Sequence, residues 1–271
     1  MVGFFDIFRD GARNTKRIFA QISGKVLSTA GVFCFRRMRY FPIITPSTPN
    51  VRNSFGYWRL SMEASLLAKH LLAFFLLLIS LTLHEWAHAW VAYRCGDETP
   101  KAAGRVTLNP LAHIDLFGTV LFPLICIFSQ SGLLFGWGKV VPMNPNNFDR
   151  RWKFLLAGGA GIFGNLLLCF IASLLLTFAP NYALIAYGLL QLNAVLIVFN
   201  ILPLPGLDGF YLLQSFARLS TETIRFLEHW GFLILLFLIQ VPLVRMILMI
   251  TVEGIMNAFI VLSAALFGVL H

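Results

Sequence analysis

Apolar residues along this chain gather in long blocks, and polar residues gather between the blocks. Three apolar blocks cover 71–92, 154–178 and 183–203, and two more, 230–250 and 254–270, lie near the end. A transmembrane helix needs roughly 20 predominantly apolar residues, so each block is suited to crossing a bilayer. The pattern predicts an all-α polytopic membrane protein.

A further apolar segment, 116–135, is interrupted by Gly118, by Pro123 and by "SQSG" at 129–132. On either side of it lie "GRVTL" (104–108) and "KVVPM" (139–143), whose β-branched residues favour extended backbone. The segment is therefore expected to be an imperfect crossing, and its two flanking pieces are expected to pair as a small β-hairpin.

Composition supports the membrane assignment. Hydrophobic residues make up 58% of the 271 positions and charged residues 12%, and the mean hydropathy is +0.77. Soluble domains are about 45–50% apolar and about 25% charged. The four cysteines show no CxxC spacing, so neither a disulfide scaffold nor a cysteine zinc site is expected.

The net charge of +9 is unevenly distributed, because ten basic residues fall within the first sixty positions. On a membrane protein such a tail favours anionic lipid over nucleic acid. We divide the chain into a basic tail at 1–60, a membrane core at 61–217 and C-terminal membrane helices at 218–271. The tail is predicted to be interfacial or partly inserted, and its mildly apolar part, 18–35, is at most a weak crossing.

Three ionisable residues interrupt the first apolar block. "HEWAH" at 84–88 fits H-E-x-x-H, in which His84 and His88 share one helix face and can both reach one Zn²⁺. Glu85, one step round the helix, can reach a metal-bound water. Ionisable residues inside a membrane span are rare and usually functional. The alternative is that they pair with other polar groups and only hold helices together.

A catalytic zinc site needs a third protein ligand and an open position for water. The best candidate is Asp208 in "FNILPLPGLDGF" (199–210), a stretch that also contains Asn200. Pro203 and Pro205 would break the helix where Asp208 must turn toward the metal. The alternative is that "LPGLDG" is an exposed turn after a helix.

Three further stretches lie between "HEWAH" and "FNILPLPGLDGF": "GRVTLNPLAHID", "FGWGKVVPMNPNNF" and "AGIFGN". In this order, the five motifs resemble those of the site-2 protease family, and specifically of its short bacterial members. The resemblance runs from about 71 to 209 and implies an intramembrane zinc metalloprotease with one Zn²⁺ per chain. It assigns His84, His88 and Asp208 as ligands and Glu85 as the base. It also places Asn200 close to the metal, where it would polarise the scissile carbonyl or hold the substrate, and, less directly, maps Asn165 onto a site position of the same kind.

Two features of the same region depart from the family or invite another interpretation. The family often has proline where this chain has Ile162, a difference that alters local shape and touches no proposed ligand. His113 and Asp115 could form a second metal site, but we expect them to cap and hydrogen-bond a loop.

The metal site constrains the topology. His84 lies in the later half of its helix and Asp208 follows the helix at 183–203, so the two helices should run parallel. An odd number of crossings must separate them, and 154–178 supplies one. We therefore expect 116–135 to be re-entrant, with 71–92, 154–178 and 183–203 forming a three-helix catalytic core.

Together these features predict an integral multi-pass zinc metallopeptidase of the bacterial cytoplasmic membrane. Its partners would be the lipid bilayer and a membrane-embedded protein substrate, cleaved within or near a transmembrane helix by water that Glu85 activates. Val106, Val140 and Val141 are predicted to hold the unwound substrate by strand addition. The alternatives are a catalytically inactive family member and a metal-handling membrane transporter or scaffold.

Overall fold

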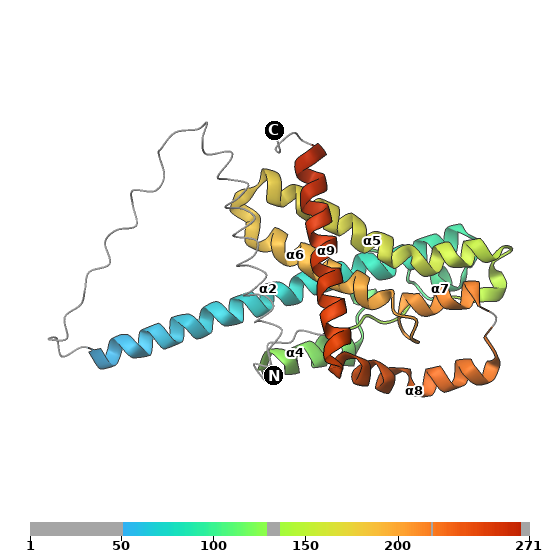
Figure 1. Cartoon of the computed structure of the whole chain (residues 1–271), viewed down its shortest axis with the longest axis horizontal. Helices are drawn as coiled ribbons and strands as arrows, with labels where there is room; N and C mark the ends of the chain where they lie inside the picture. Colours follow the sequence, from blue (N-terminus) through green and yellow to red (C-terminus); the bar gives the residue numbers. More distant parts are fainter. Residues whose placement is uncertain (1–50, 129–135, 218, 267–271) are drawn as a thin grey trace.

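The computed structural model describes residues 51–128, 136–217 and 219–266 of the chain (Figure 1). Its long helices are α2 (Val51–Arg94), α5 (Arg151–Phe178), α6 (Ala183–Asn200), α8 (Thr221–Gln240) and α9 (Pro242–Leu266). The shorter ones are α3 (Thr99–Ala102), η1 (Pro110–Ala112), η2 (Leu116–Leu121), α4 (Phe122–Phe128), η3 (Pro145–Asn147), η4 (Pro180–Tyr182) and α7 (Asp208–Phe216).

Four of these helices are long and apolar enough to cross a membrane. They are α5, α6, α9 and the Leu67–Arg94 part of α2. The predicted all-α architecture is thus confirmed for the described residues. Helices are found at the three predicted core positions, but α2 begins at Val51, well before the predicted start at residue 71. Helix α8 has 20 residues but is not one of the four, and its beginning carries Glu222, Arg225 and Glu228.

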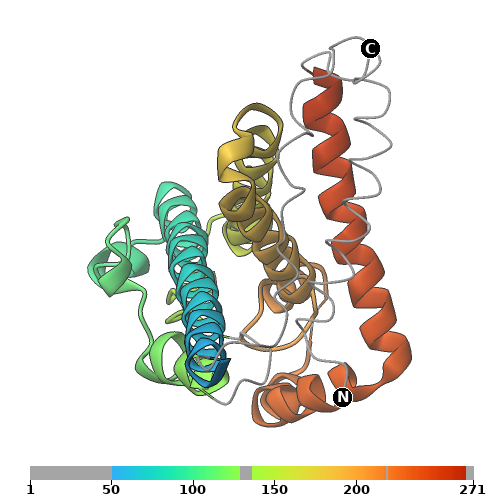
Figure 2. The same cartoon turned by 90° about the vertical axis from the view of Figure 1, so that its left-hand side faces the viewer.

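Helices α2, α5 and α6 pack against one another, and α9 covers α5 and α6 away from α2 (Figure 2). Their buried apolar cluster consists of Leu76, Cys169, Ala172, Leu189, Leu190, Ala194, Ile197 and Met256. Helices α5 and α2 are in direct contact, since a Cβ at Gly164 would lie at an ordinary van der Waals distance, 3.5 Å, from the Ala87 Cβ. The close packing places α5 directly against the part of α2 that carries His84.

The predicted boundaries of the last two helices are wrong. The apolar blocks at 230–250 and 254–270 suggested a break near residue 252, whereas α8 ends at Gln240 and α9 begins at Pro242. Proline suits the first position of a helix because its φ is already helical and no intrahelical donor is lost there. Hydropathy alone missed this break because apolar residues continue through it. The two helices run in different directions from this junction (Figure 1).

The predicted β-hairpin is also wrong, because the described residues contain no strand. The Lys139 amide donates to the His113 carbonyl at 2.9 Å, so residue 139 pairs with the loop after η1 instead of with 104–108. The Arg105 guanidinium donates to the carbonyls of Ala112 and Lys139. Hydrogen bonds from the Arg105 side chain therefore take the place of the backbone hydrogen bonds that were predicted between 104–108 and 139–143.

Residues 116–128 form η2 and α4, which together are too short to cross a bilayer as a helix. The Trp137 amide donates to the Gly118 carbonyl at 3.1 Å, so the chain after residue 136 lies beside η2. Positions 129–132 and the predicted tail up to residue 50, including 18–35, lie outside the described residues. The rest of the predicted tail, 51–60, belongs to α2.

Candidate metal centre

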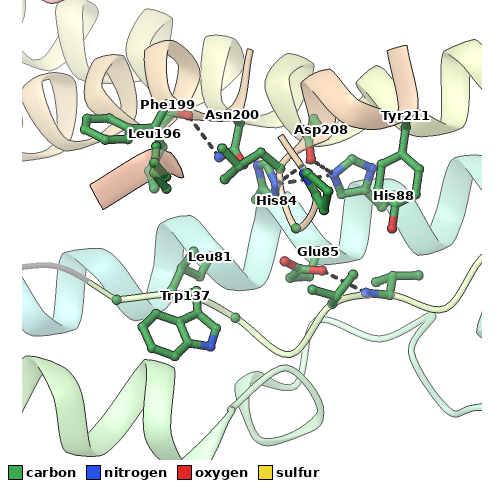
Figure 3. Close-up of a pocket in the computed structure, with 18 of the residues that line it drawn as sticks. Leu81, His84, Glu85, His88, Trp137, Leu196, Phe199, Asn200, Asp208 and Tyr211 are labelled. Carbon is green, nitrogen blue, oxygen red and sulfur yellow. Dashed lines mark hydrogen bonds and ion pairs between the residues drawn. The ribbon is translucent and has the colours of Figure 1, made fainter. Parts of the chain in front are cut away.

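Three buried side chains from two distant parts of the chain meet at one point (Figure 3). His84 and His88 come from α2, and Asp208 is the first residue of α7. The Asp208 Oδ1 atom lies 3.5 Å from the Nε2 atom of His84 and 3.0 Å from that of His88. The two Nε2 atoms are 3.3 Å apart. The sequence prediction that Asp208 turns back toward the two histidines agrees with this geometry.

The spacing of these three atoms suits a tetrahedral metal ion. Ligand atoms around zinc, with bonds of about 2.0–2.1 Å, lie roughly 3.3 Å apart. Two imidazoles and one carboxylate leave a fourth position open, as in hydrolytic zinc sites. The Oδ2 atom of Asp208 is buried without a hydrogen-bond partner, and a cation beside this carboxylate would offset that burial.

The Nδ1 atoms of both histidines are held by α5. The His88 Nδ1 atom lies 2.7 Å from the Ala157 carbonyl oxygen, which accepts only if Nδ1 carries the proton. The His84 Nδ1 atom lies 3.1 Å from the Asn165 side-chain amide, whose Oδ1 atom has no partner. Rotating that amide by half a turn would let Oδ1 accept from Nδ1–H. Both Nε2 lone pairs are then directed toward Asp208, which is the arrangement that a metal requires.

Gly161 of α5 makes room for the two imidazoles. A Cβ atom at this position would lie 2.3 Å from the His88 Nε2 atom and 2.6 Å from the His84 Nε2 atom. These distances are far below van der Waals contact, so no larger residue fits without moving the metal-binding atoms. Gly161 belongs to the "AGIFGN" motif that resembles the site-2 protease family, and this lack of space is the physical reason for a glycine there.

The turn between α6 and α7 brings Asp208 to the histidines. Helix α6 ends at Asn200, two prolines follow, and Gly206 adopts a φ of +87°, which favours glycine. A Cβ at Gly209 would lie 2.3 Å from the Ile201 carbonyl oxygen, so α7 begins directly against the end of α6. As predicted, the helix ends before the two prolines and Asp208.

Glu85 lies on the other side of the cavity from Asp208 (Figure 3). Its Oε2 atom accepts a hydrogen bond from the Val141 amide at 3.2 Å, and Gly138 packs against the same carboxylate. Glu85 is 8% exposed, so its carboxylate faces the interior of the site and little solvent. Glu85 lines the same cavity as the histidine–aspartate cluster.

A cavity of about 340 Å³ adjoins these groups. Polar groups lie on its metal side, and its remaining lining is mostly apolar: Leu81, Trp137, Val140, Met143, Leu196, Phe199, Phe232 and Leu235. The last two belong to α8, whose Gly231 packs against Pro205. Helix α8 therefore closes one side of the site.

The segment 137–141 crosses the cavity with alternating hydrogen bonds. The amides of Trp137, Lys139 and Val141 donate to protein acceptors, namely the Gly118 and His113 carbonyls and Glu85. Within the described part of the chain, the backbone groups of Gly138 and Val140 have no hydrogen-bond partner. A period of two is the signature of extended backbone, so these unpaired groups point away from the bonded ones.

The remaining predicted site residues lie at different distances from the cavity. Asn200, Val140 and Val141 line the cavity, and Asn165 lies buried behind His84. Val106 is half-buried and does not line the cavity. His113 and Asp115 act as expected in the loop: the His113 Nε2 atom bonds the Thr107 carbonyl, and Asp115 caps η2.

Sequence reasoning missed two anchoring residues and one cavity residue. Asp97 accepts from the Asn144 amide at 2.8 Å and from the Asn147 side chain at 2.7 Å, and it also accepts from the amide of Thr99, the first residue of α3. Burial alone would raise the pKa of Asp97, but these hydrogen bonds outweigh burial and lower it. The second anchor is Arg105, and nothing in the sequence distinguishes Asp97 or Arg105 from other loop residues.

The cavity residue is Tyr211, and only its i+3 spacing from Asp208 could have indicated that it lines the cavity.

Comparisons with known proteins agree with this site. The chain is 39% identical over 181 residues to "Putative zinc metalloprotease YwhC" of Bacillus subtilis, covering 62% of this chain and 79% of that protein. It is 37% identical over 176 residues to "Putative zinc metalloprotease Rip2" of Mycolicibacterium smegmatis, covering 61% of this chain and 65% of that protein. The Rip2 protein of Mycobacterium tuberculosis is 33% identical over 150 residues, or 54% of this chain and 57% of its own length.

Neither a protein-family profile nor a solved structure matched the chain. The match to YwhC nevertheless spans more than two thirds of that relative at well over 30% identity. The chain therefore belongs to the family of zinc metalloproteases that YwhC and Rip2 represent, which are relatives of the site-2 proteases.

Proposed function

We propose that this chain is an intramembrane zinc metallopeptidase that hydrolyses a peptide bond within or near a transmembrane helix of a membrane-embedded protein. The observation that carries the proposal is the buried cluster of His84, His88 and Asp208, with Glu85 facing it from a helix long and apolar enough to span a bilayer. Buried ionisable groups at membrane depth are costly, and function is the usual reason for keeping them there.

The three clustered side chains would hold one Zn²⁺ per chain. When bound, zinc would make a water molecule more acidic and polarise the carbonyl of the peptide bond. The donor set of two imidazoles and a carboxylate, the open fourth position and the histidine orientation set by α5 all suit this ion.

Glu85 would act as general base and then as general acid. Its carboxylate would take a proton from the attacking water and pass that proton to the leaving nitrogen. The Val141 amide orients the carboxylate through Oε2 and leaves Oε1 facing Gly138 at the cavity. The protein supplies the base already oriented, which reduces the reorganisation that the reaction needs.

The substrate would lie along residues 137–141 as an added strand. A transmembrane helix uses its own backbone groups in hydrogen bonds, so the peptide must unwind before cleavage and then needs new partners. The unpaired backbone groups of Gly138 and Val140 could provide them beside Glu85. This placement keeps Val140 and Val141 as substrate-strand residues and no longer uses Val106, which lies away from the cavity.

The short helices at 116–128 support a re-entrant segment in this proposal. With this segment not crossing, α5 would be the crossing between α2 and α6, and His84 in α2 and Asp208 after α6 would then lie at the same depth. The protein would then be a multi-pass protein of the bacterial cytoplasmic membrane, with the basic tail at 1–60 beside anionic lipid.

The decisive test compares the wild-type chain with Glu85→Gln, both purified in lipid. Zinc content is measured by elemental analysis, and cleavage of a membrane-embedded reporter is followed by mass spectrometry. We expect equal zinc in both and cleavage only in the wild type. Cleavage that persists in Glu85→Gln would contradict the proposal. Zinc binding without any wild-type cleavage would favour an inactive family member, and zinc movement across the bilayer would favour a transporter.

A further inference from the structure

Tyr211 occupies a position on α7 that none of the roles above uses. It follows Asp208 by three residues, so both side chains lie on one face of the helix. Both line the cavity. Figure 3 shows Tyr211 beside His88, with its hydroxyl directed toward the side of the cavity where Glu85 lies.

The ring of Tyr211 is fixed by packing. It stands edge-on to Phe154, with ring centroids 6.0 Å apart and an interplanar angle of 89°. Its Cβ atom fills the space beside Gly158, where an added Cβ would lie 2.7 Å away. A phenylalanine would make the same contacts, so packing does not explain the hydroxyl.

The hydroxyl has no hydrogen-bond partner among the residues that the structure describes. Asn200, the other neutral donor considered for the substrate, is partly committed, because its Nδ2 atom donates to the Leu196 carbonyl at 2.9 Å. The two residues flank the metal-binding cluster from opposite sides, Asn200 near His84 and Tyr211 near His88 (Figure 3). Tyr211 therefore offers an uncommitted O–H donor on the His88 side of the cluster.

We propose that the Tyr211 hydroxyl donates a hydrogen bond to the oxygen of the scissile carbonyl as that oxygen becomes negatively charged. This inference rests on the proposed peptidase function. As the water oxygen bonds to the carbonyl carbon, the carbonyl π electron pair moves onto its oxygen, and Glu85 takes the proton released by the water. Tyr211 keeps its own proton throughout and contributes only the hydrogen bond.

A donor of this kind acts on the transition state more than on the bound substrate. Removing one preorganised oxyanion donor lowers kcat by about 10²–10³-fold in well-studied hydrolases. An interaction made only in the transition state changes kcat and leaves KM nearly constant. A residue that merely supports the fold would instead lower zinc content and thermal stability.

The test uses the full chain in lipid and the variant Tyr211→Phe, with Tyr182→Phe as the control because Tyr182 is 60% exposed. We expect kcat for the membrane reporter to fall by about 10²-fold in Tyr211→Phe, with KM within about threefold and zinc content unchanged. Binding of a phosphinic peptide, whose charged oxygen imitates the transition state, should weaken by at least about tenfold. The Tyr182→Phe variant should match the wild type in all four measurements.

Wild-type kcat in Tyr211→Phe would overturn the inference and leave the peptidase proposal intact. A fall in zinc content or melting temperature that parallels the fall in kcat would also overturn it, in favour of a supporting role. Absent wild-type cleavage, or full cleavage by Glu85→Gln, would overturn the proposed function and this inference with it. The Glu85→Gln arm therefore separates the two failures.

Discussion

Two walls of the cavity differ in how they are held. The metal-binding wall consists of α2, α5 and the start of α7, and its polar atoms are fixed by buried contacts between helices. The loop wall consists of residues 136–143. Arg105 donates to its Lys139 carbonyl, and Asp97 accepts from the amide of Asn144, the residue that follows it. The difference indicates that metal position depends on helix packing, whereas substrate position depends on a few side-chain anchors.

This division has a chemical reason. A metal site tolerates errors of only a few tenths of an ångström in its ligand atoms, and packed helices provide that accuracy. A substrate strand must enter and leave, so its partner needs unpaired backbone groups and cannot be part of a closed ladder. Damage to the metal-binding wall should therefore remove zinc, and damage to the loop wall should impair cleavage while zinc stays bound.

The largest effect is expected for Gly161→Ala in the metal-binding wall. The new Cβ would overlap the two Nε2 atoms, so we expect loss of nearly all bound zinc and all cleavage. The matched control is Gly159→Ala on the same helix, where the nearest contact would be an ordinary 3.7 Å to Leu212. Elemental analysis of both variants checks the prediction. Full zinc content in Gly161→Ala would show that the helices can shift apart.

A smaller effect on the same wall is expected for Asn165→Ala. Losing the group that orients His84 should weaken zinc binding by about 10–100-fold. A zinc titration against a competing chelator measures this change. Ser173→Ala serves as the control, since Ser173 is buried in the same helix and its hydroxyl donates to the Phe170 carbonyl of its own turn. Equal affinities for both variants would contradict a role for Asn165 at the metal.

On the loop wall, Val140→Pro removes an amide that has no partner within the described residues. We expect kcat/KM for the reporter to fall by about three- to tenfold, the cost of one hydrogen bond to the substrate, with zinc content unchanged. Val140→Ala keeps the amide and should lose less. If both variants are equally impaired, the side chain matters and the proposed strand addition does not.

The smallest effect on activity is expected for Asp97→Asn, which weakens the anchor of the loop wall. Because the pKa of Asp97 is lowered from its model-compound value of 3.8, the anchor holds above that pH and is lost as pH falls through the lowered pKa. Hydrogen exchange of residues 139–147 should rise in the wild type only at such low pH, whereas the variant should show high exchange at pH 7 with less than about a threefold rise in KM. Equal exchange in both proteins at pH 7 would exclude Asp97 as the anchor.

Part of the fold could be predicted because hydropathy blocks and H-E-x-x-H depend on local spacing. Helices at 71–92, 154–178 and 183–203 were found because a bilayer sets a minimum length for apolar runs. The junction at Pro242 and the absence of a hairpin were missed for a different reason. Both depend on which neighbours the backbone meets, as when Arg105 and His113, instead of a second strand, take the hydrogen bonds of Lys139.

By itself, the sequence determined the membrane class, the pair of histidines on one helix face and the glutamate beside them, because these follow from composition and helical periodicity. It also identified Asp208 as the best third ligand through the prolines that end α6. Only the tertiary structure decided that Ala157 and Asn165 orient the imidazoles, that Gly161 makes room for them and that Tyr211 reaches the cavity. Those relations join residues far apart in the chain, and their distances depend on how closely α2, α5 and α7 pack.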